Sequence, residues 1–347
     1  MSFAVEAPRP DNFQCRFGMC TDVQYADVPD GVSFVGRVRY YRDALRCLRR
    51  AVLGWNSNSA QFGFHLGDII DGFAGDQSVE ALETVMQEFA SFNQKTYHIL
   101  GNHCLYNLTR PHLNKRLGIP EAPGGGSYYS FSPHAGWRFV VLDSYDISLL
   151  GWEPSHPHTR LASRLLDERN PNEDKNSPSG LSGTDMRFVR FNGGVGEAQL
   201  RWLSLQCEEA ARQRERVVVF SHVPLHPSSA PGVTLLWNFQ EVLDVIAASP
   251  CVAATFAGHL HEERYHRDGC GVHHLVLKGI VETEPETPCH AIVDLCADAI
   301  HVHGFGMQSR VLPLVPLGGP FAAATHAEAS FGAMAVEVMR KFPAMDV

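Results

Sequence analysis

Short apolar runs along the chain alternate with segments whose apolar residues recur every three or four positions. The runs predict buried strands because they are short and are bounded by glycine and polar residues. They cover 16–20, 62–66, 96–100, 137–142, 217–220 and 252–256. Helical spacing joins Tyr41, Ala44, Leu45, Leu48, Val52 and Trp55, and later Leu200, Leu203, Cys207 and Ala210. This alternation of strand and helix predicts a layered α/β fold.

Three later apolar runs, 273–277, 290–295 and 300–303, follow one another without helical segments between them. Consecutive strands without crossover helices are expected to pair antiparallel. We therefore predict a two-sheet sandwich flanked by helices, with four layers in the order α/β/β/α. Ligands in such folds gather at the carboxyl ends of the strands, so the site is expected there.

The domain prediction is a single unit over residues 1–312 with a loop-rich insertion at about 104–185. Inside the insertion we expect only the strand at 137–142 and a helix near 159–169. The remaining residues, 313–347, form a tail whose alanine-rich part, 322–339, is typical of a helix. This tail has no recognisable chemistry.

Composition narrows the class of partner and the compartment. The chain has 347 residues and a formal net charge of −9, which argues against nucleic acid because binding to its phosphates needs lysine and arginine. Its nine cysteines are an odd number without a Cys-x-x-Cys pair, as is typical of a reduced intracellular chain. No apolar segment is long enough for a membrane helix or a signal peptide. We expect a cytoplasmic protein that binds a small molecule; protein partners stay open.

Candidate metal ligands follow five of the predicted strands. They are Asp22, Gln24, Asp68, Asn102, His222, His259 and His261. A hydrolytic pair of divalent cations requires one carboxylate that binds both ions, together with amide and imidazole donors that each bind one. A single histidine is more often structural, but five such fragments in one chain favour a metal centre.

Asp68 is the carboxylate best suited to bridge the two cations. The first metal is then expected to bind Asp22, Gln24, Asp68 and His261, and the second to bind Asp68, Asn102, His222 and His259. If 258–261 is extended, residues two apart point the same way, so that both imidazoles face the metals and Leu260 faces the core.

These fragments resemble the calcineurin-like metallophosphoesterase superfamily, whose pattern is Asp-x-His, Gly-Asp-x-x-Asp, Gly-Asn-His-Asp/Glu, His and Gly-His-x-His. The resemblance covers about residues 15–305. Gln24 stands where most members have histidine. In this respect the chain resembles the manganese-dependent ADP-ribose/CDP-alcohol diphosphatases, which have glutamine at that position. Other stretches similar to that family are 22–27, 67–72, 142–146, 170–172, 191–194 and 281–283.

The resemblance implies a metallophosphoesterase-type sandwich that hydrolyses the phosphoanhydride of ADP-ribose and of CDP-alcohols such as CDP-choline and CDP-glycerol. A hydroxide activated by the two metals would attack phosphorus and release a nucleoside monophosphate and a phospho-sugar or phospho-alcohol. The amide of Gln24 makes the first site harder, which favours Mn²⁺ while leaving Mg²⁺ and Zn²⁺ open. A cyclic-nucleotide phosphodiesterase, a phosphomonoesterase and a metal-free scaffold stay as alternatives.

The resemblance also implies roles around the metals. His103 is expected to contact a phosphoryl oxygen or to protonate the leaving group, and Asp71 to support the centre without binding metal. Cys104 takes the place of the usual acidic residue, so either another carboxylate orients His103 or His103 is a weaker acid-base group. A nucleophilic Cys104 is the sharper but less favoured alternative, because the metals already activate water.

Substrate contacts are expected from aromatic and cationic side chains near the first strand. A nucleoside needs an apolar wall, and phosphate charge left over by the metals needs a cation. Phe34, Phe191 and Arg39 are the candidates. The alternative is that both phenylalanines belong to the core and that Arg39 is a solvated charge at a helix start.

Overall fold

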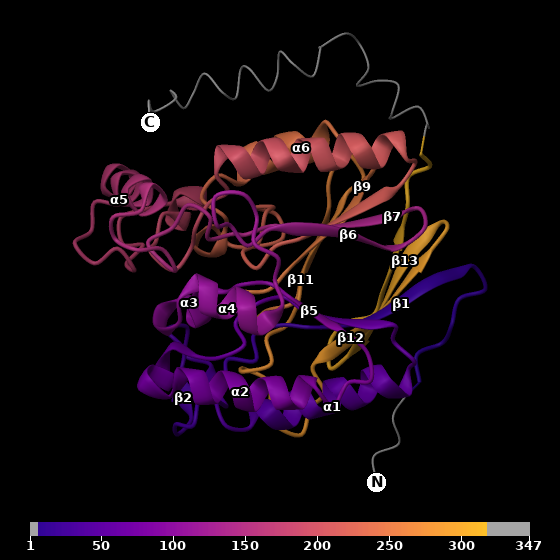
Figure 1. Ribbon diagram of the computed structural model, residues 1–347, viewed down its shortest axis with the longest axis horizontal. Coiled ribbons are helices and arrows are strands. Elements are labelled where there is room, and N and C mark those ends of the chain that lie inside the picture. The colour runs from indigo at the N-terminus through magenta and orange to yellow at the C-terminus, as the bar shows by residue number, and fades with distance from the viewer. Residues whose placement is uncertain (1–5, 318–347) are drawn as a thin grey trace.

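The structure, a computed structural model, describes residues 6–317 and builds two six-stranded sheets that face each other between helical layers (Figure 1). The four-layer prediction is thereby confirmed. The alanine-rich part of the predicted tail lies outside the described residues.

Both sheets combine parallel and antiparallel strands. From one edge to the other, the first sheet contains β14 (Arg310–Pro313), β13 (Ala299–Phe305), β12 (His290–Cys296), β1 (Phe13–Cys20), β4 (Phe62–His65) and β5 (Thr96–His98). The second contains β10 (Arg264–Arg267), β11 (His273–Val276), β9 (Val252–Ala257), β8 (Arg216–Phe220), β7 (Trp137–Val141) and β6 (Tyr129–His134). A separate hairpin pairs β2 (Gly31–Val32) with β3 (Val38–Arg39).

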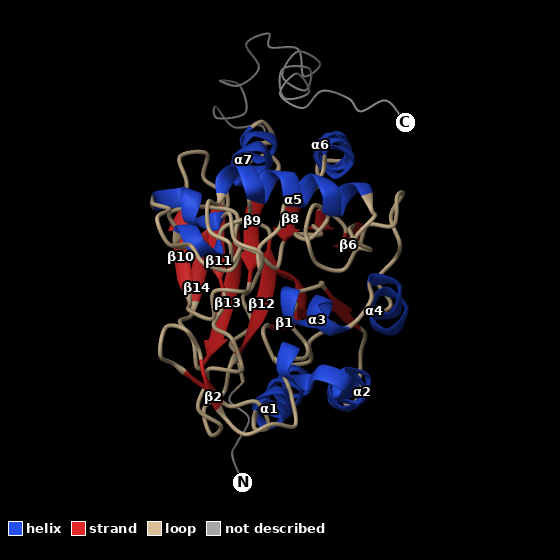
Figure 2. Cartoon of the chain, turned by 90° about the vertical axis from the view of Figure 1, so that its left-hand side faces the viewer, coloured by secondary structure: helices blue, strands red, loops and turns tan. Residues whose placement is uncertain are grey.

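The two outer layers are helical. Helices α1 (Ala44–Ser57) and α2 (Ser78–Phe89) lie on the side of the first sheet, and α6 (Glu197–Arg212) and α7 (Phe239–Ala247) on the side of the second (Figure 2). The connections hold α3 (Asn102–Asn107), α4 (Arg110–Leu117), α5 (Pro157–Arg169) and three short 3₁₀ helices, Gly72–Gln77, Gly183–Arg187 and Gly232–Thr234. No helix in the described range 6–317 is both long and apolar enough to cross a membrane.

Aromatic side chains fill the space between the sheets. Phe64 of β4 stacks on Phe220 of β8 with ring centroids 4.2 Å apart, which joins the two sheets directly. On the outer face of the first sheet, Trp55 of α1 lies flat over Gly18 and Gly63, where an added Cβ would overlap the indole. The apolar stripe predicted from spacing is therefore the face by which α1 packs on the sheet.

Strand directions gather the predicted ligands at one end of the sandwich. β1, β4 and β5 run parallel, as do β7, β8, β9 and β11. The expectation that the runs 273–277, 290–295 and 300–303 pair antiparallel is confirmed for β12 and β13 but was wrong for β11, which lies in the other sheet beside β9. An unpredicted strand, β10, follows β9 and pairs antiparallel with β11. Because β10 reverses the chain direction, β11 runs parallel to β9 although no helix lies between them.

The stretch 104–185 is more regular than expected, because α4 and β6 also interrupt it. The cues for α4 are present in the sequence: Pro111 stands in its first turn, and Gly118 ends it with φ of 64°. Arg110 anchors the helix by an ion pair with buried Asp143 and by a stack on Trp152 at 4.2 Å. Because α4 is short and polar and is held by these side-chain contacts, its sequence shows little apolar periodicity, and the helix was not predicted.

Candidate metal centre

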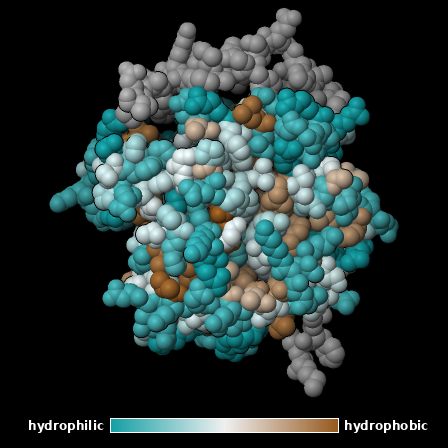
Figure 3. Space-filling model, viewed as in Figure 1, coloured by the Kyte–Doolittle hydropathy of each residue, from teal (hydrophilic) through white to brown (hydrophobic). Residues whose placement is uncertain are grey.

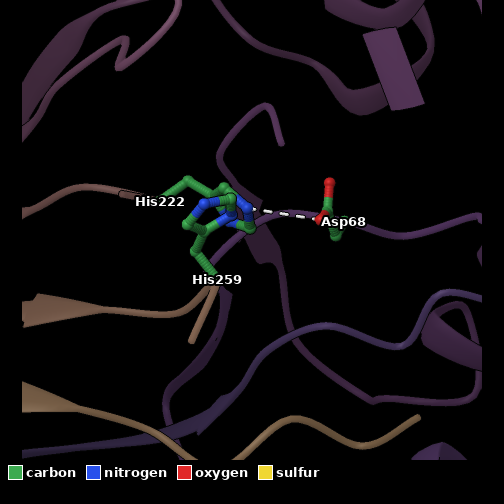
Figure 4. A group of neighbouring side chains, drawn as sticks. All are labelled: Asp68, His222 and His259. Carbon is green, nitrogen blue, oxygen red and sulfur yellow. Dashed lines mark ion pairs between the residues drawn. The ribbon is translucent and has the colours of Figure 1, made fainter. Parts of the chain in front are cut away.

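The predicted ligands lie directly beyond β1, β4, β5, β8 and β9, in loops except for Asn102, which is the first residue of α3. His261 Nε2 is 3.2 Å from Asp22 Oδ1 and 2.9 Å from Gln24 Nε2, which forms one group. The potential ligand atoms of Asp68, His222 and His259 lie within 4.8 Å of one another and form a second group (Figure 4). Asn102 joins through its neighbour His103, whose backbone N–H donates to Asp68 at 2.8 Å.

Asp68 connects the two groups. Its Oδ2 accepts a hydrogen bond from Gln24 Nε2 at 3.1 Å and lies 3.3 Å from His222 Nε2. The carboxylate is completely buried, as are Asp22 and Gln24 beside it. A buried anion in contact with members of both groups is what a shared ligand requires.

The charges in the site call for cations. Burial alone would raise the pKa of Asp68, but His222 and His103 lower it to about 2. Burial lowers the pKa of His261, yet Asp22 and Glu282 raise it to about 9. Without metal, protons on imidazoles thus balance the buried carboxylates, and divalent ions bound there would take over that role.

Among the seven candidate ligands, two buried side-chain atoms lack hydrogen-bond partners. Gln24 Oε1 has none, and His222 Nε2 is close to Asp68 but not aligned for a hydrogen bond. Buried polar atoms are nearly always paired, so such atoms point to a missing ligand. Together with the mix of carboxylate, amide and imidazole donors, they fit a divalent cation.

The imidazoles of His222 and His261 are oriented by oxygen atoms that contact their Nδ1 atoms. His222 Nδ1 lies 2.7 Å from the backbone oxygen of Leu66, and His261 Nδ1 lies 2.9 Å from Glu282 Oε1. Each contact holds the proton on Nδ1 and leaves Nε2 for a metal. Glu282 was missed as a site residue; its stretch, 281–283, drew notice only by family resemblance.

Asn102 is oriented by two tyrosines that the sequence reasoning also missed. Tyr145 donates from its hydroxyl to Asn102 Oδ1 at 3.0 Å, and Asn102 Nδ2 donates to the Tyr106 hydroxyl at 3.0 Å. These two contacts fix the orientation of the Asn102 amide, with its oxygen toward Tyr145 and its nitrogen toward Tyr106. The only signal for Tyr145 was its place in the family-like stretch 142–146.

His103 has a carboxylate beside it although Cys104 follows it. Asp71 Oδ2 lies 2.9 Å from His103 Nδ1 without the alignment of a hydrogen bond, and Nδ1 accepts one from the Gly72 backbone N–H at 3.3 Å. Cys104 is buried, and its sulfur accepts a hydrogen bond from the Ile69 backbone at 3.3 Å. Burial raises the pKa of its thiol to about 12, which removes the thiolate that a nucleophile needs.

Most predicted ligands have a left-handed backbone. Positive φ angles occur at Asp22 (52°), Gln24 (44°), Asp68 (58°), His259 (67°) and His261 (63°). Residues other than glycine rarely adopt this conformation, and it persists where surrounding contacts hold it, commonly at functional sites. The expectation that 258–261 is extended was therefore wrong. The two imidazoles reach different groups because each residue turns the chain.

Two glycines beside the ligands are required by close packing. A Cβ at Gly67, whose φ is 103°, would overlap the imidazole of His222, and a Cβ at Gly101 would overlap the carboxylate of Asp68. The glycines of Gly-Asp and Gly-Asn thus let three ligand loops come together.

Aromatic rings border the site. Phe34, at the tip of the β2–β3 hairpin, is 79% exposed, and its ring centroid lies 6.4 Å from that of Phe191. Phe191 in turn lies 6.0 Å from the ring of His259. Phe34 is therefore not a core residue, and the two rings form an apolar edge beside the candidate ligands. On the face drawn in Figure 3, hydrophobic residues form separate small patches within a largely hydrophilic surface.

Arg39 is not the solvated charge of the alternative interpretation. Its side chain is only 14% exposed, and its guanidinium lies 3.6 Å from Asp71 and 3.5 Å from Glu282. It thus stands between the carboxylates that contact His103 and His261. A cavity of about 380 Å³ opens next to His261 and Glu282, with Arg37, Glu262, Glu263, Arg264 and Lys278 as its other lining residues.

Comparison with known proteins matches residues 15–263 to the family described as calcineurin-like phosphoesterase. A protein from Oryza sativa subsp. japonica is 46% identical over 290 residues, which are 83% of this chain and 90% of its own. A human protein is 38% identical over 308 residues, 84% of this chain and 90% of its own. Both are named manganese-dependent ADP-ribose/CDP-alcohol diphosphatase.

A solved structure gives the same picture. The crystal structure of a dimetal phosphatase from Danio rerio superposes with a TM-score of 0.84 at 36% sequence identity. The match covers 87% of this chain and all of the other. PhoD is 11% identical with a TM-score of 0.53, a likeness of fold only.

Proposed function

The chain belongs to the manganese-dependent ADP-ribose/CDP-alcohol diphosphatases of the calcineurin-like phosphoesterases, and on this premise we propose that it hydrolyses the phosphoanhydride of ADP-ribose and of CDP-alcohols. Water would add to one phosphorus while the bond to the bridging oxygen breaks. ADP-ribose would give AMP and ribose 5-phosphate, and CDP-choline would give CMP and phosphocholine. CDP-glycerol would react in the same way.

The observation that carries this proposal is the buried Asp68 carboxylate in contact with both ligand groups. Two divalent cations held there would lower the pKa of a shared water and neutralise phosphoryl charge. Asp22, Gln24, Asp68 and His261 would hold one cation, and Asp68, Asn102, His222 and His259 the other. The proposed metal is Mn²⁺, in keeping with the amide oxygen of Gln24, with Mg²⁺ and Zn²⁺ as substitutes.

His103 is proposed to stabilise a phosphoryl oxygen or to give a proton to the leaving phosphate. Its side chain is 16% exposed, so substrate can reach it, and the Asp71 carboxylate lies 2.9 Å from its Nδ1. Asp71 thus takes the supporting role that an acidic residue at position 104 would otherwise fill. Cys104 packs beneath the Ile69 backbone and takes no part in the reaction.

Phe34 and Phe191 are proposed to hold the nucleoside base, since both rings lie at the edge of the site. Arg39 remains a candidate phosphate contact, but Asp71 and Glu282 already compensate its charge.

The proposed surroundings of the enzyme follow from charge and cysteines. A net charge of −9 disfavours a nucleic acid partner, so a small nucleotide is the proposed substrate. The nine cysteines, all within the described range, are free thiols, and eight of them are buried. This supports the cytoplasm as the proposed compartment.

A coupled phosphate assay tests the function. The protein is incubated with ADP-ribose, CDP-choline, AMP or a cyclic nucleotide in Mn²⁺ or Mg²⁺, and free phosphate is measured with and without an added phosphatase. Phosphate from ADP-ribose and CDP-choline should appear only after the phosphatase is added. Direct release from AMP would indicate a phosphomonoesterase, and hydrolysis of a cyclic nucleotide alone would indicate a phosphodiesterase. No turnover in either metal would point to a scaffold.

A further inference from the structure

Asn192 is a buried amide beside the candidate metal centre that the proposed reaction does not use. Its Oδ1 lies 2.8 Å from Nε2 of His259. Its Nδ2 donates hydrogen bonds to the backbone oxygens of Arg187 and Val233, both at 2.9 Å. Carbonyl oxygens accept and never donate, so these two contacts fix the nitrogen end of the amide on their side and the oxygen end toward His259.

The fixed amide decides where the proton of His259 lies. An amide oxygen only accepts hydrogen bonds, so Nε2 of a neutral His259 must carry the proton and donate it. We propose that Asn192 is a positioning residue that holds His259 in the Nε2-protonated form, leaving the lone pair of Nδ1 for a cation shared with Asp68 and His222. This inference rests on the proposed metal centre.

His259 would then differ from the other two histidines of the centre. His222 and His261 use Nδ1 to contact an oxygen behind them and keep Nε2 for metal. For His259 the supporting oxygen lies on the Nε2 side, so the binding atom changes. Partners of this kind fix ring orientation as well as the proton, and their loss usually weakens metal binding.

The segment around Asn192 is rigid enough for this task. The Trp237 backbone N–H donates to the Gly193 oxygen at 2.8 Å, and the Trp237 indole donates to the Val189 oxygen at 3.2 Å. On the N-terminal side of Asn192, Arg187 Nε donates a hydrogen bond to the Trp237 backbone oxygen at 2.6 Å, so that Trp237 contacts the segment both before and after Asn192. Phe191 directly precedes Asn192. The same hydrogen-bonded segment therefore positions the aromatic ring at the edge of the site and the amide that contacts His259.

Metal titration of the full-length chain, stripped of metal, tests the proposal without any substrate. Asn192→Ala removes the oxygen that accepts from His259 and should weaken one of two Mn²⁺ binding steps by about 10- to 100-fold in calorimetry. Asn192→Asp keeps an acceptor oxygen but cannot donate to both carbonyls. It should lose thermal stability while binding Mn²⁺ much more tightly than Asn192→Ala.

Asn170 provides a matched control. It is also fully buried and donates from Nδ2 to the Phe188 and Ser177 oxygens at 2.8 and 3.1 Å, but its Oδ1 accepts from Asn172 rather than from a site histidine. Asn170→Ala should lower the melting temperature and leave both Mn²⁺ steps unchanged. An equal loss of Mn²⁺ affinity in Asn170→Ala would reduce Asn192 to a general structural role and overturn the proposal.

The proton itself can be observed in chains labelled with ¹⁵N-histidine. Long-range ¹H–¹⁵N couplings in the metal-free wild type should show His259 protonated at Nε2, and Asn192→Ala should show a mixture of the two forms. A proton on Nδ1 in the wild type, or unchanged Mn²⁺ affinity in Asn192→Ala, would refute the assignment. Failure to hydrolyse ADP-ribose would count against the proposed function only, because neither measurement uses substrate.

Discussion

Phe34 offers a sharp test of how the nucleoside is held, because its ring contributes little to the core. At 79% exposure, its removal should change the free energy of unfolding by no more than about 0.5 kcal/mol, the usual effect of a surface substitution. A base stacked on an aromatic ring gains about 1–3 kcal/mol per ring. Phe34→Ala should therefore lower kcat/KM for ADP-ribose by about 5- to 150-fold.

The assay compares two substrates and two variants. ADP-ribose carries a base to stack, whereas methyl p-nitrophenyl phosphate has no nucleoside, so its kcat/KM should change far less. Val35→Ala is the matched control, since Val35 is 61% exposed on the same hairpin tip. It should leave both substrates near the wild-type rate.

Two results would refute the reasoning about Phe34. Equal losses on the two substrates would show that the ring supports the catalytic centre rather than the nucleoside. A fall in melting temperature of Phe34→Ala large enough to explain the kinetics would show that the hairpin packs as core. Either result would also leave the ring of Phe191 without its proposed partner.

Further predictions concern the metal ligands and their neighbours. Asp68→Ala should lose turnover and bound metal together, and more of both than Gln24→Ala; retention of two tightly bound metals would disprove its bridging position. Gln24→His should shift the ratio of rates away from Mn²⁺, and an unchanged Mn²⁺, Mg²⁺ and Zn²⁺ profile would contradict the hardness argument. His103→Asn should lower kcat by about 10²–10⁴ at constant metal content, whereas Cys104→Ser should be nearly silent. Without metal, the raised pKa of His261, about 9 against 6.5, stabilises the fold below pH 6.5. That stability should fade as pH rises through 9, so a flat melting temperature in EDTA would be the contrary result.

The strands and the positions of the candidate ligands could be predicted because both depend on local sequence. The five ligand-bearing strands are apolar runs buried in a two-sheet sandwich, and polar residues directly beyond them must lie at the sheet ends. Side-chain types then indicated a metal. None of this required knowledge of which distant segments touch.

The backbone of the ligand loops could not be predicted, because distant hydrogen bonds determine it. Gly279 donates to the His261 oxygen at 3.2 Å, and Val281 donates to the Asp22 oxygen at 3.0 Å. Such contacts hold left-handed turns that sequence alternation does not indicate. Glu282 and Asn192 were missed for the same reason, because their contacts with His261 and His259 join segments that are separate in the chain.

In the proposed enzyme, the β2–β3 hairpin joins the candidate nucleoside contact to the candidate metal centre. Its tip presents Phe34, and its last strand ends in Arg39, which lies between Asp71 and Glu282. Because these carboxylates lie beside His103 and His261, a shift of Arg39 would disturb both the proposed acid-base group and a candidate metal ligand. Arg39→Ala should then impair ADP-ribose and the small phosphodiester alike, in contrast to Phe34→Ala. A loss confined to ADP-ribose would show instead that Arg39 contacts only the nucleotide.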